Sequence, residues 1–281
     1  MSMQTVTGKV VAITGAGSGI GRELALRAAR GGALLAISDW NAAGLAETVD
    51  LVKGVGAREV RSDVVDVSDR AGMGRWADAV VDQLGRVDMV VNNAGVSATG
   101  HFEEMSYDDF DWIVGVNLMG VVHGTKEFLP HLIASGDGAL VNISSLFGLI
   151  SVPGQSAYNA TKYAVRGFTE AIREEMLVSR HPVTVTCVHP GGIKTAISRN
   201  GRKTAGQDAD ALDDLFERKL ARMTPDKAAR IILDGALAGK ARVLVGIDSH
   251  VLHHFARLTG SRYQDVVARM SDVAARGRFD G

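Results

Sequence analysis

The sequence predicts an α/β protein built on a doubly wound sheet of about seven parallel strands, with a helical extension at the C-terminus. Short continuous apolar runs alternate with longer stretches of helical periodicity, and such runs are typical of parallel strands that are buried on both faces. The chain also holds 33 glycines and only 5 prolines among 281 residues, which suits many tight turns between strands and helices. These observations favour one large domain with helices on both faces of the sheet.

Strands and helices are expected to alternate along the chain. The predicted strands cover residues 10–14, 33–38, 57–65, 87–91, 139–143, 183–188 and 242–246. The predicted helices cover residues 22–30, 41–52, 70–84, 106–134, about 158–180 and 224–239. Ser106 and Thr224 are expected to cap their helices, and Pro130 is expected to kink or end the long helix that contains it. Because each strand returns through a helix, the sheet is predicted to be parallel.

The alternation of strands and helices stops near residue 247, so residues 1–247 are predicted to form a single domain. Within it, residues 194–223 are polar with weak periodicity, and we expect a lid there with a short helix near residues 210–222. Residues 248–281 form the predicted extension, which shows two amphipathic helical patterns. These helices are expected to pack against the domain or a partner subunit, and they can also cover part of a substrate pocket.

Composition excludes several classes of partner. The net charge is −1, so there is no electrostatic case for nucleic acid or an anionic membrane as a partner. No apolar run approaches the ~20 residues needed to span a bilayer, and no basic stretch followed by an apolar one opens the chain, so we expect a cytoplasmic protein. The one cysteine, Cys187, cannot form a disulfide within the chain. His250, His253 and His254 lack a matching set of carboxylates or cysteines, so no metal is predicted.

A glycine-rich turn joins the first predicted strand to the first helix. It runs from Gly15 to Gly21 and reads G-A-G-S-G-I-G. Glycines in such a turn let the backbone approach a pyrophosphate, and the helix that follows supplies N–H groups and its dipole. A glycine cluster alone is weak evidence, but the order strand, turn, helix predicts a nucleotide phosphate site.

Carboxylates follow the next two strands and are candidates for the adenosine half of a dinucleotide. Asp39 stands eighteen residues beyond Gly21, where a carboxylate accepts hydrogen bonds from ribose hydroxyls and repels a 2′-phosphate. This favours NAD over NADP, although Arg22 lies close in sequence and could weaken the discrimination. Asp66 and Asp63 both remain candidates for the adenine amino group.

The stretch from Ser145 to Lys162 carries a possible acid–base group. Tyr158 and Lys162 are four residues apart, one turn from each other on a helix, and Ser145 follows a predicted strand. A lysine ammonium near a phenol favours the phenolate and lowers the phenol pKa, so the group could move a proton at an oxygen near pH 7. The alternative is an ordinary helix whose lysine extends into water. Asn117, in the long helix, needs a partner if it is buried.

Taken together, these motifs resemble the classical short-chain dehydrogenase/reductase family over about residues 6–247. The matching residues are Thr14-Gly15-x-x-x-Gly19-x-Gly21, Asp39, Asn92-Asn93-Ala94-Gly95, Asn117, Ser145, Tyr158-x-x-x-Lys162 and Pro190-Gly191. The resemblance implies a Rossmann-like fold with catalytic residues Asn117, Ser145, Tyr158 and Lys162. It implies cofactor contacts from Gly15, Ser18, Gly19, Ile20, Gly21, Asp39, Asp66, Val67, Asn93, Ala94, Gly95, Tyr158, Lys162, Pro190, Gly191, Ile193 and Thr195.

By the same resemblance, each catalytic residue has an expected role. Tyr158 is the general acid/base and Ser145 holds the substrate oxygen. Lys162 binds the nicotinamide ribose and lowers the Tyr158 pKa, and Asn117 helps to hold a water that links Lys162 to solvent. A homodimer or homotetramer is expected, through the helices that start near residues 106 and 157.

The predicted function is NAD-dependent interconversion of a secondary alcohol and a ketone. The apolar residues after Ser145 suggest a hydrophobic or alicyclic substrate, although they are as well suited to the core; they are Leu146, Phe147, Leu149, Ile150 and Val152. Two alternatives are an NADPH-dependent ketone reductase and a dinucleotide-binding regulatory protein without turnover.

Overall fold

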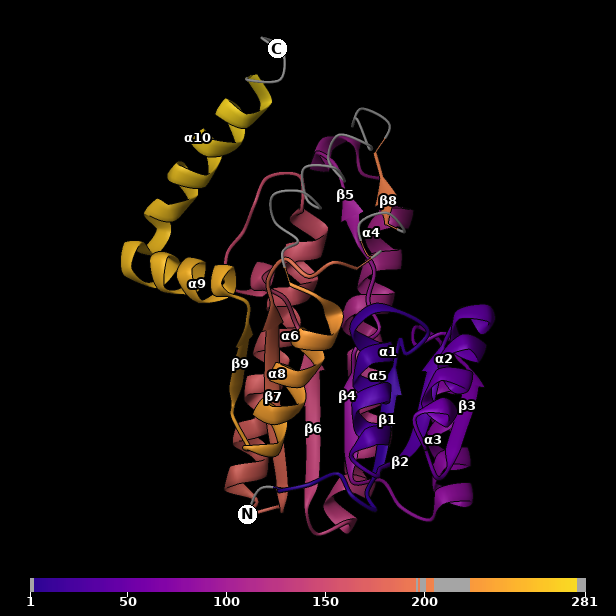
Figure 1. The fold of residues 1–281 in the computed structure, drawn as a ribbon. Helices are drawn as coiled ribbons and strands as arrows, with labels where there is room; N and C mark the ends of the chain where they lie inside the picture. The colour runs from indigo at the N-terminus through magenta and orange to yellow at the C-terminus, as the bar shows by residue number, and fades with distance from the viewer. Residues whose placement is uncertain (1–2, 196, 198–200, 205–222, 277–281) are drawn as a thin grey trace.

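A parallel seven-stranded sheet forms the centre of the protein. The computed structural model describes residues 3–195, 197, 201–204 and 223–276. The strands lie in the order β3-β2-β1-β4-β6-β7-β9 and all pair in parallel (Figure 1). Their bounds are β1 Val10–Thr14, β2 Leu34–Asp39, β3 Val60–Val64, β4 Met89–Asn92, β6 Gly138–Ile143, β7 Val183–Pro190 and β9 Arg242–Val245. The predicted Rossmann-like α/β fold is confirmed.

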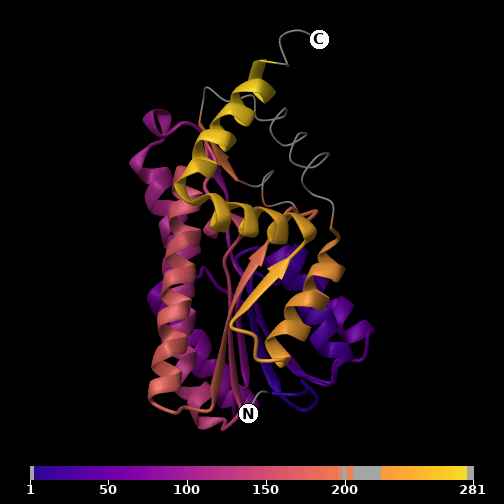
Figure 2. The same ribbon diagram turned by 90° about the vertical axis from the view of Figure 1, so that its left-hand side faces the viewer.

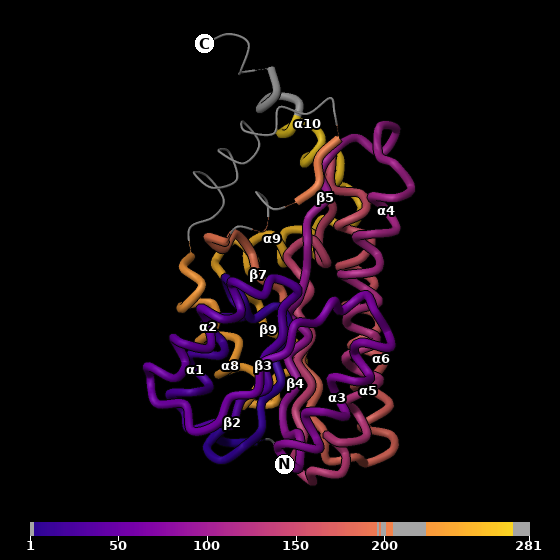
Figure 3. The backbone as a smooth tube through the Cα atoms, turned by 90° about the vertical axis from the view of Figure 1, so that its right-hand side faces the viewer, coloured from indigo at the N-terminus to yellow at the C-terminus, as the bar shows by residue number. Residues whose placement is uncertain are grey.

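Helices cover both faces of this sheet (Figure 3). One layer comprises α1 (Gly19–Arg30), α2 (Ala42–Gly54) and α8 (Pro225–Leu237). The other comprises α3 (Arg70–Leu84), α5 (Gly120–Ala134) and α6 (Ser156–Val178). The strand order reverses between β1 and β4, and ligands of such sheets bind at the carboxyl ends of the strands beside this point.

The continuous apolar strands follow from the two layers. Along β1, Ile13 belongs to the core under α1, α2 and α8, whereas Val10 and Ala12 belong to the core under α3, α5 and α6. Because successive side chains of a strand point to opposite faces, a strand covered on both faces must be apolar at every position. Thus β1 is buried at all five residues.

The long helix predicted over residues 106–134 is interrupted. It consists of α4 (Tyr107–Val114), a π-helical turn (Gly115–Met119) and α5. Asn117, fully buried, lies in this turn. Ser106 caps α4 as predicted, its Oγ accepting from the Asp109 N–H. Pro130 lies inside α5 and does not end it: only one backbone donor is missing, and Phe128 and Leu132 on either side are anchored in the core.

Part of the expected lid forms a small ribbon. β8 (Arg202–Lys203) pairs in parallel with β5 (Ala98–Thr99), which follows the β4 motif. The Arg202 guanidinium also contacts the Trp112 ring, 4.3 Å from its centroid, and forms an ion pair with Asp109 at 2.9 Å. The helix expected near residues 210–222 lies outside the described residues.

The C-terminal extension contains the two expected helices, α9 (Ile247–Thr259) and α10 (Tyr263–Arg276). α9 lies across the top of β9 toward α6, and α10 leads away from the body of the domain (Figure 2). Leu146 and Ile150 share a buried cluster with Tyr263, against which Leu252 and Phe255 pack. The extension therefore covers the segment that follows Ser145. In the part of the chain described here, no helix is both long and apolar enough to cross a membrane.

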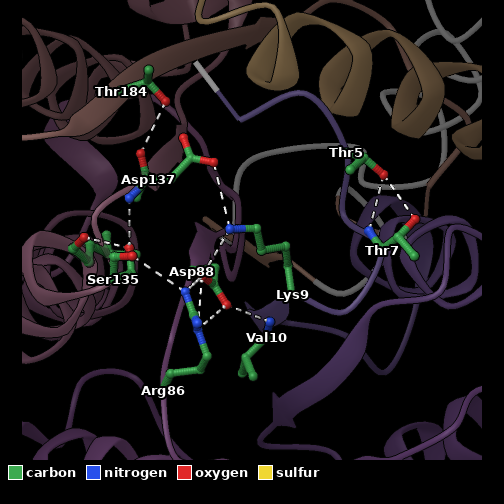
Figure 4. Close-up of polar contacts among 11 residues, drawn as sticks. Thr5, Thr7, Lys9, Val10, Arg86, Asp88, Ser135, Asp137 and Thr184 are labelled. Atoms are coloured by element: carbon green, nitrogen blue, oxygen red, sulfur yellow. Dashed lines mark hydrogen bonds and ion pairs between the residues drawn. The ribbon is translucent and has the colours of Figure 1, made fainter. Parts of the chain in front are cut away.

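A buried carboxylate ties the strands together at the amino end of the sheet. Asp88 has no solvent-exposed surface, and its Oδ2 accepts from the Val10 N–H at 2.9 Å. Arg86 donates from Nε to Asp88 at 3.0 Å, and the Lys9 ammonium lies 3.5 Å away (Figure 4). A buried charge that is paired and hydrogen-bonded in this way is a structural element.

Candidate active site

The glycine turn is packed tightly against the segment that follows β4. Asn93 donates from Nδ2 to the carbonyls of Thr14 and Gly15, at 2.9 and 3.1 Å. A Cβ at Gly15 would lie 2.8 Å from the Ala94 Cα, and one at Gly21 would lie 2.1 Å from the Gly15 carbonyl oxygen. Gly15 also has a positive φ of 66°. Glycine is required at both positions, and the two predicted cofactor motifs meet at the switch between β1 and β4.

The first turn of α1 has backbone donors free for a phosphate. Ser18 occupies the N-cap position but makes no side-chain bond there, and no acidic residue stands in the first turn. By contrast, Asn41, Asp69 and Ser106 cap α2, α3 and α4 with their side chains. The N-terminal N–H groups and the helix dipole of α1 therefore fit an anionic pyrophosphate. Ile20, from the same turn, packs partly on the core.

Asp39 lies where the sequence predicts the adenosine ribose contact. It is buried, and its two carboxylate oxygens accept from the N–H groups of Gly17 at 2.7 Å and Asn41 at 2.9 Å. The Arg22 guanidinium donates to the Gly17 carbonyl at 2.6 Å and to Glu47 at 2.8 Å. The Asp39 carboxylate keeps lone pairs free, because each oxygen can accept more than one bond.

The two candidates for adenine recognition occupy different environments. Asp63 lies within β3 and forms an ion pair with Arg61 at 2.7 Å. Asp66 is exposed beyond the carboxyl end of β3, where its Oδ1 accepts from the Ser68 N–H at 2.9 Å. Val67, the next predicted contact, is buried, and its carbonyl bonds the His123 ring at 3.0 Å.

The three catalytic candidates come together at the carboxyl end of β6 and the start of α6. Ser145 follows β6, and its Oγ accepts from the Phe147 N–H at 3.1 Å. Lys162 is buried, with its Nζ 5.6 Å from the centroid of the Tyr158 ring and donating to the Ile143 carbonyl at 3.1 Å. No carboxylate pairs with this ammonium among the described residues.

Burial sets the proton affinities of this group. It raises the pKa of the Tyr158 phenol, and a hydrogen bond with the Ser145 side chain opposes the rise. This direction is opposite to the lowering expected from Lys162, because burial removes the solvent that would stabilise the charged phenolate. Burial also lowers the pKa of Lys162 to about 8. At pH 7 the protein therefore holds a neutral phenol beside a mostly charged lysine.

Asn117 braces the neighbouring backbone. Its Oδ1 accepts from the Val96 N–H at 2.8 Å, and its Nδ2 donates to the Val96 carbonyl at 2.9 Å. A Cβ at Gly95 would lie 3.3 Å from the Asn117 Oδ1 and 3.4 Å from the Lys162 Nζ. Asn117, Gly95 and Lys162 thus converge on one place. The alternative of an exposed helix residue is excluded for Asn117.

The segment after β7 closes the remaining side of the site. Gly191 follows Pro190, and a Cβ there would lie 2.2 Å from a carboxylate oxygen of Asp248. Ile193 is buried, and a Cβ at Gly19 would lie 3.2 Å from the Thr195 side chain. Thr195 is therefore next to the glycine turn. The predicted cofactor residues that follow β7 thus adjoin those that follow β1.

Two supporting residues escape sequence reasoning. His189 is fully buried, and its Nδ1 lies 2.9 Å from the Ser145 carbonyl; burial lowers the pKa of His189 to about 4, so the ring is neutral and donates this bond. Asn159 donates to the carbonyls of Phe147 at 2.7 Å and Ile150 at 3.0 Å. Both hold the segment around Ser145. The sequence signals that could have indicated these two residues are their positions: His189 comes just before Pro190, and Asn159 comes just after Tyr158.

Comparison with known proteins identifies the family. The short chain dehydrogenase family matches residues 9–206. The putative oxidoreductase SadH of Mycobacterium tuberculosis is 54% identical over 266 residues, covering 95% of this chain and 96% of SadH. Epidermal retinol dehydrogenase 2 of Mus musculus is 40% identical over 195 residues, covering 69% of this chain and 63% of that protein. The crystal structure of a short chain dehydrogenase/reductase from Burkholderia phymatum in complex with NAD has a TM-score of 0.86 and 29% identity, and covers 93% of this chain and 97% of that one.

The chain belongs to the classical short-chain dehydrogenase/reductase family, as the sequence motifs predict. It is an oxidoreductase of that family. The NAD-bound neighbour supports a nicotinamide dinucleotide as cofactor, and the uncapped first turn of α1 fits its phosphates.

Proposed function

We propose that the protein is an NAD-dependent oxidoreductase that interconverts a secondary alcohol and a ketone. The observation that carries this proposal is the buried ammonium of Lys162, which has no carboxylate partner among the described residues and lies beside the partly buried ring of Tyr158. Burying an unpaired charge costs free energy, so a protein retains one where it acts on a ligand. The bound cofactor supplies the hydride chemistry, and the protein supplies position and proton transfer.

Tyr158 is proposed to exchange the proton at the substrate oxygen, and Ser145 to hold that oxygen by its hydroxyl. A phenol whose pKa is raised by burial is a proton donor at pH 7, which suits reduction of a ketone. The positive charge of Lys162 stabilises the phenolate in the reverse direction. Lys162 is also proposed to bind the nicotinamide ribose, and Asn117 to help hold a water that carries the proton toward solvent.

NAD is proposed as the preferred cofactor because Asp39 repels a 2′-phosphate and Arg22 is bonded elsewhere. The same argument speaks against the NADPH-dependent alternative. In Asp39→Ala we expect affinity for NADH to fall and affinity for NADPH to rise, narrowing the preference at least about tenfold, because one charge-assisted contact and one repulsion are lost. Dissociation constants for both cofactors, measured by fluorescence, test this. Unchanged constants in the variant would remove Asp39 from cofactor selection.

A hydrophobic or alicyclic substrate is proposed. Phe147 remains a candidate for the pocket wall, since its ring meets that of Tyr158 edge to face with centroids 6.1 Å apart. Leu146 and Ile150 are buried in a cluster with Tyr263 beneath the C-terminal extension, and Phe147 also packs against that cluster, which supports the core alternative for Leu146 and Ile150. The retinol dehydrogenase name of one relative is consistent with a large apolar alcohol.

The test is NADH formation from NAD across secondary alcohols that range from short-chain to steroidal, with Tyr158→Phe and a control in parallel. General acid–base catalysis contributes about 10²–10⁴-fold, so turnover in Tyr158→Phe should fall by that factor. The control is Tyr163→Phe, on the same helix but half-buried beside Tyr263. Equal turnover in the two variants would remove Tyr158 from its role. A protein that binds NADH but oxidises nothing in the panel would contradict the proposed substrate class.

A cytoplasmic homodimer or homotetramer, assembled through α4, α5 and α6, is proposed as the working form. Apolar side chains near the end of α6 support an interface there: Leu177 is 59% exposed and Val178 84% exposed. Sedimentation of the purified protein tests the assembly.

A further inference from the structure

A pocket lies beside the β9 edge of the sheet, below the C-terminal extension. Its volume is about 490 Å³, and α6, β9 and α9 contribute its charged lining residues. These are Arg166 from α6, Arg242 from β9, and His253 and Arg257 from α9. Ser145, Tyr158 and Lys162 do not line this pocket, so it is separate from the catalytic group.

The charges around this pocket are unbalanced. Glu170 forms ion pairs with both Arg166, at 3.1 Å, and Arg242. Arg257 is exposed and makes no ion pair or hydrogen bond with any described residue. Three guanidinium groups are thus matched by one carboxylate among the described residues, although the whole chain has a net charge of only −1. The excess of positive charge is a local feature of this pocket.

The pKa of His253 is affected by the same excess of positive charge. Burial lowers its pKa, and four neighbouring cationic groups lower it further: Arg242, His254, Arg166 and Arg257. The part of this shift that comes from the arginine charges also favours an anion in the pocket, because the same positive potential that disfavours the imidazolium attracts negative charge.

We propose that this pocket binds an anion that carries a carboxylate or phosphate group. Arg257 is available to bind it directly, and the Arg166 and Arg242 guanidinium groups keep donors beyond those used on Glu170, because each has five. Leu149, Ala256 and Tyr263 give the pocket an apolar wall against which a short carbon chain can lie. The ligand is either a free small anion or the acidic end of a longer apolar molecule.

The experiment follows His253 by NMR in histidine-labelled protein, with its signal assigned through His253→Gln. Inorganic phosphate, acetate and octanoate are each titrated at constant ionic strength, with chloride as the reference. Binding should raise the His253 pKa, because an anion favours the imidazolium. Octanoate that binds more tightly than acetate would identify a longer apolar acid, and equal affinities would identify a small anion. A signal at His253 also distinguishes this pocket from phosphate bound at α1.

Two matched variants complete the test. Arg257→Gln removes a pocket cation and should weaken phosphate binding at least about tenfold, the usual value of a charge-assisted contact. Arg269→Gln removes the same charge from an exposed site on α10 outside the pocket and should leave binding unchanged. Chloride and phosphate that move the His253 signal equally, or equal affinities in the two variants, would overturn the proposal.

Discussion

Two buried ionisable side chains lie at opposite ends of the sheet and differ in how their charges are balanced. At the amino end, Asp88 is bonded to Arg86, Lys9 and the Val10 N–H. At the carboxyl end, the Lys162 ammonium makes a single hydrogen bond with the described residues, to the Ile143 carbonyl, and has no carboxylate partner among them. The Asp88 carboxylate is paired and holds strands together, whereas the Lys162 ammonium is available to a ligand. A buried charge whose hydrogen bonds and ion pairs are complete, such as Asp88, indicates a structural role. A buried charge without an oppositely charged partner, such as Lys162, indicates a functional role.

The largest expected effect is the loss of turnover when the available charge is removed. Lys162→Met replaces the ammonium by an apolar chain of similar length, so Tyr158 loses the cation that stabilises its phenolate. We expect kcat to fall at least about hundredfold. Steady-state kinetics with Lys126→Met as control check this, because Lys126 lies on α5 and is exposed. Comparable turnover in both variants would show that the buried ammonium has no part in the reaction.

Removing the paired charge should instead affect stability alone. Asp88→Asn leaves Arg86 and Lys9 without their buried partner, but both are partly exposed and can be hydrated. We expect a loss of about 3 kcal/mol in the free energy of unfolding, the low end for a broken buried pair. Urea unfolding measures it, with the more exposed Asp137→Asn as the control. A folded Asp88→Asn protein with greatly reduced turnover would break the comparison.

The fold was predictable because its signals are local. The central strands β1, β2, β4 and β6 are mostly apolar and end at or next to glycine or polar residues, so these strands and the motifs beside them could be placed from the sequence. Where prediction failed, long-range contacts decided the outcome. α5 continues past Pro130, with Phe128 and Leu132 buried in the core on either side of it. The contacts of Asn117 with Val96 accompany a π-helical turn that periodicity alone does not reveal.

The site was predictable in its residue types but not in its energetics. The sequence motifs predict Ser145, Tyr158 and Lys162 as a group, and the structure brings them together. The direction of the Tyr158 pKa depends on how completely the ring is buried, which spacing does not show. Likewise, the packing of Tyr263, more than a hundred residues later, in one cluster with Leu146 could not be placed from the sequence.

The comparison also gives a signed dependence of stability on pH. A solvated lysine has a pKa of about 10.4, whereas burial lowers that of Lys162 to about 8. Between these values Lys162 binds more protons in the unfolded chain than in the folded one, so the contribution of this residue to the free energy of unfolding rises with pH. The full cost of the buried charge, up to about 3 kcal/mol, is present below pH 8 and fades toward pH 10.

The most direct test of the account is the free energy of unfolding of Lys162→Met, measured against the wild-type protein in urea at pH 7 and again at pH 10, without cofactor. If the protein retains Lys162 for catalysis at a cost in stability, the variant is more stable at pH 7, and its advantage shrinks at pH 10. If the variant is less stable than the wild type at both pH values, Lys162 is a structural residue like Asp88, and the central claim is contradicted.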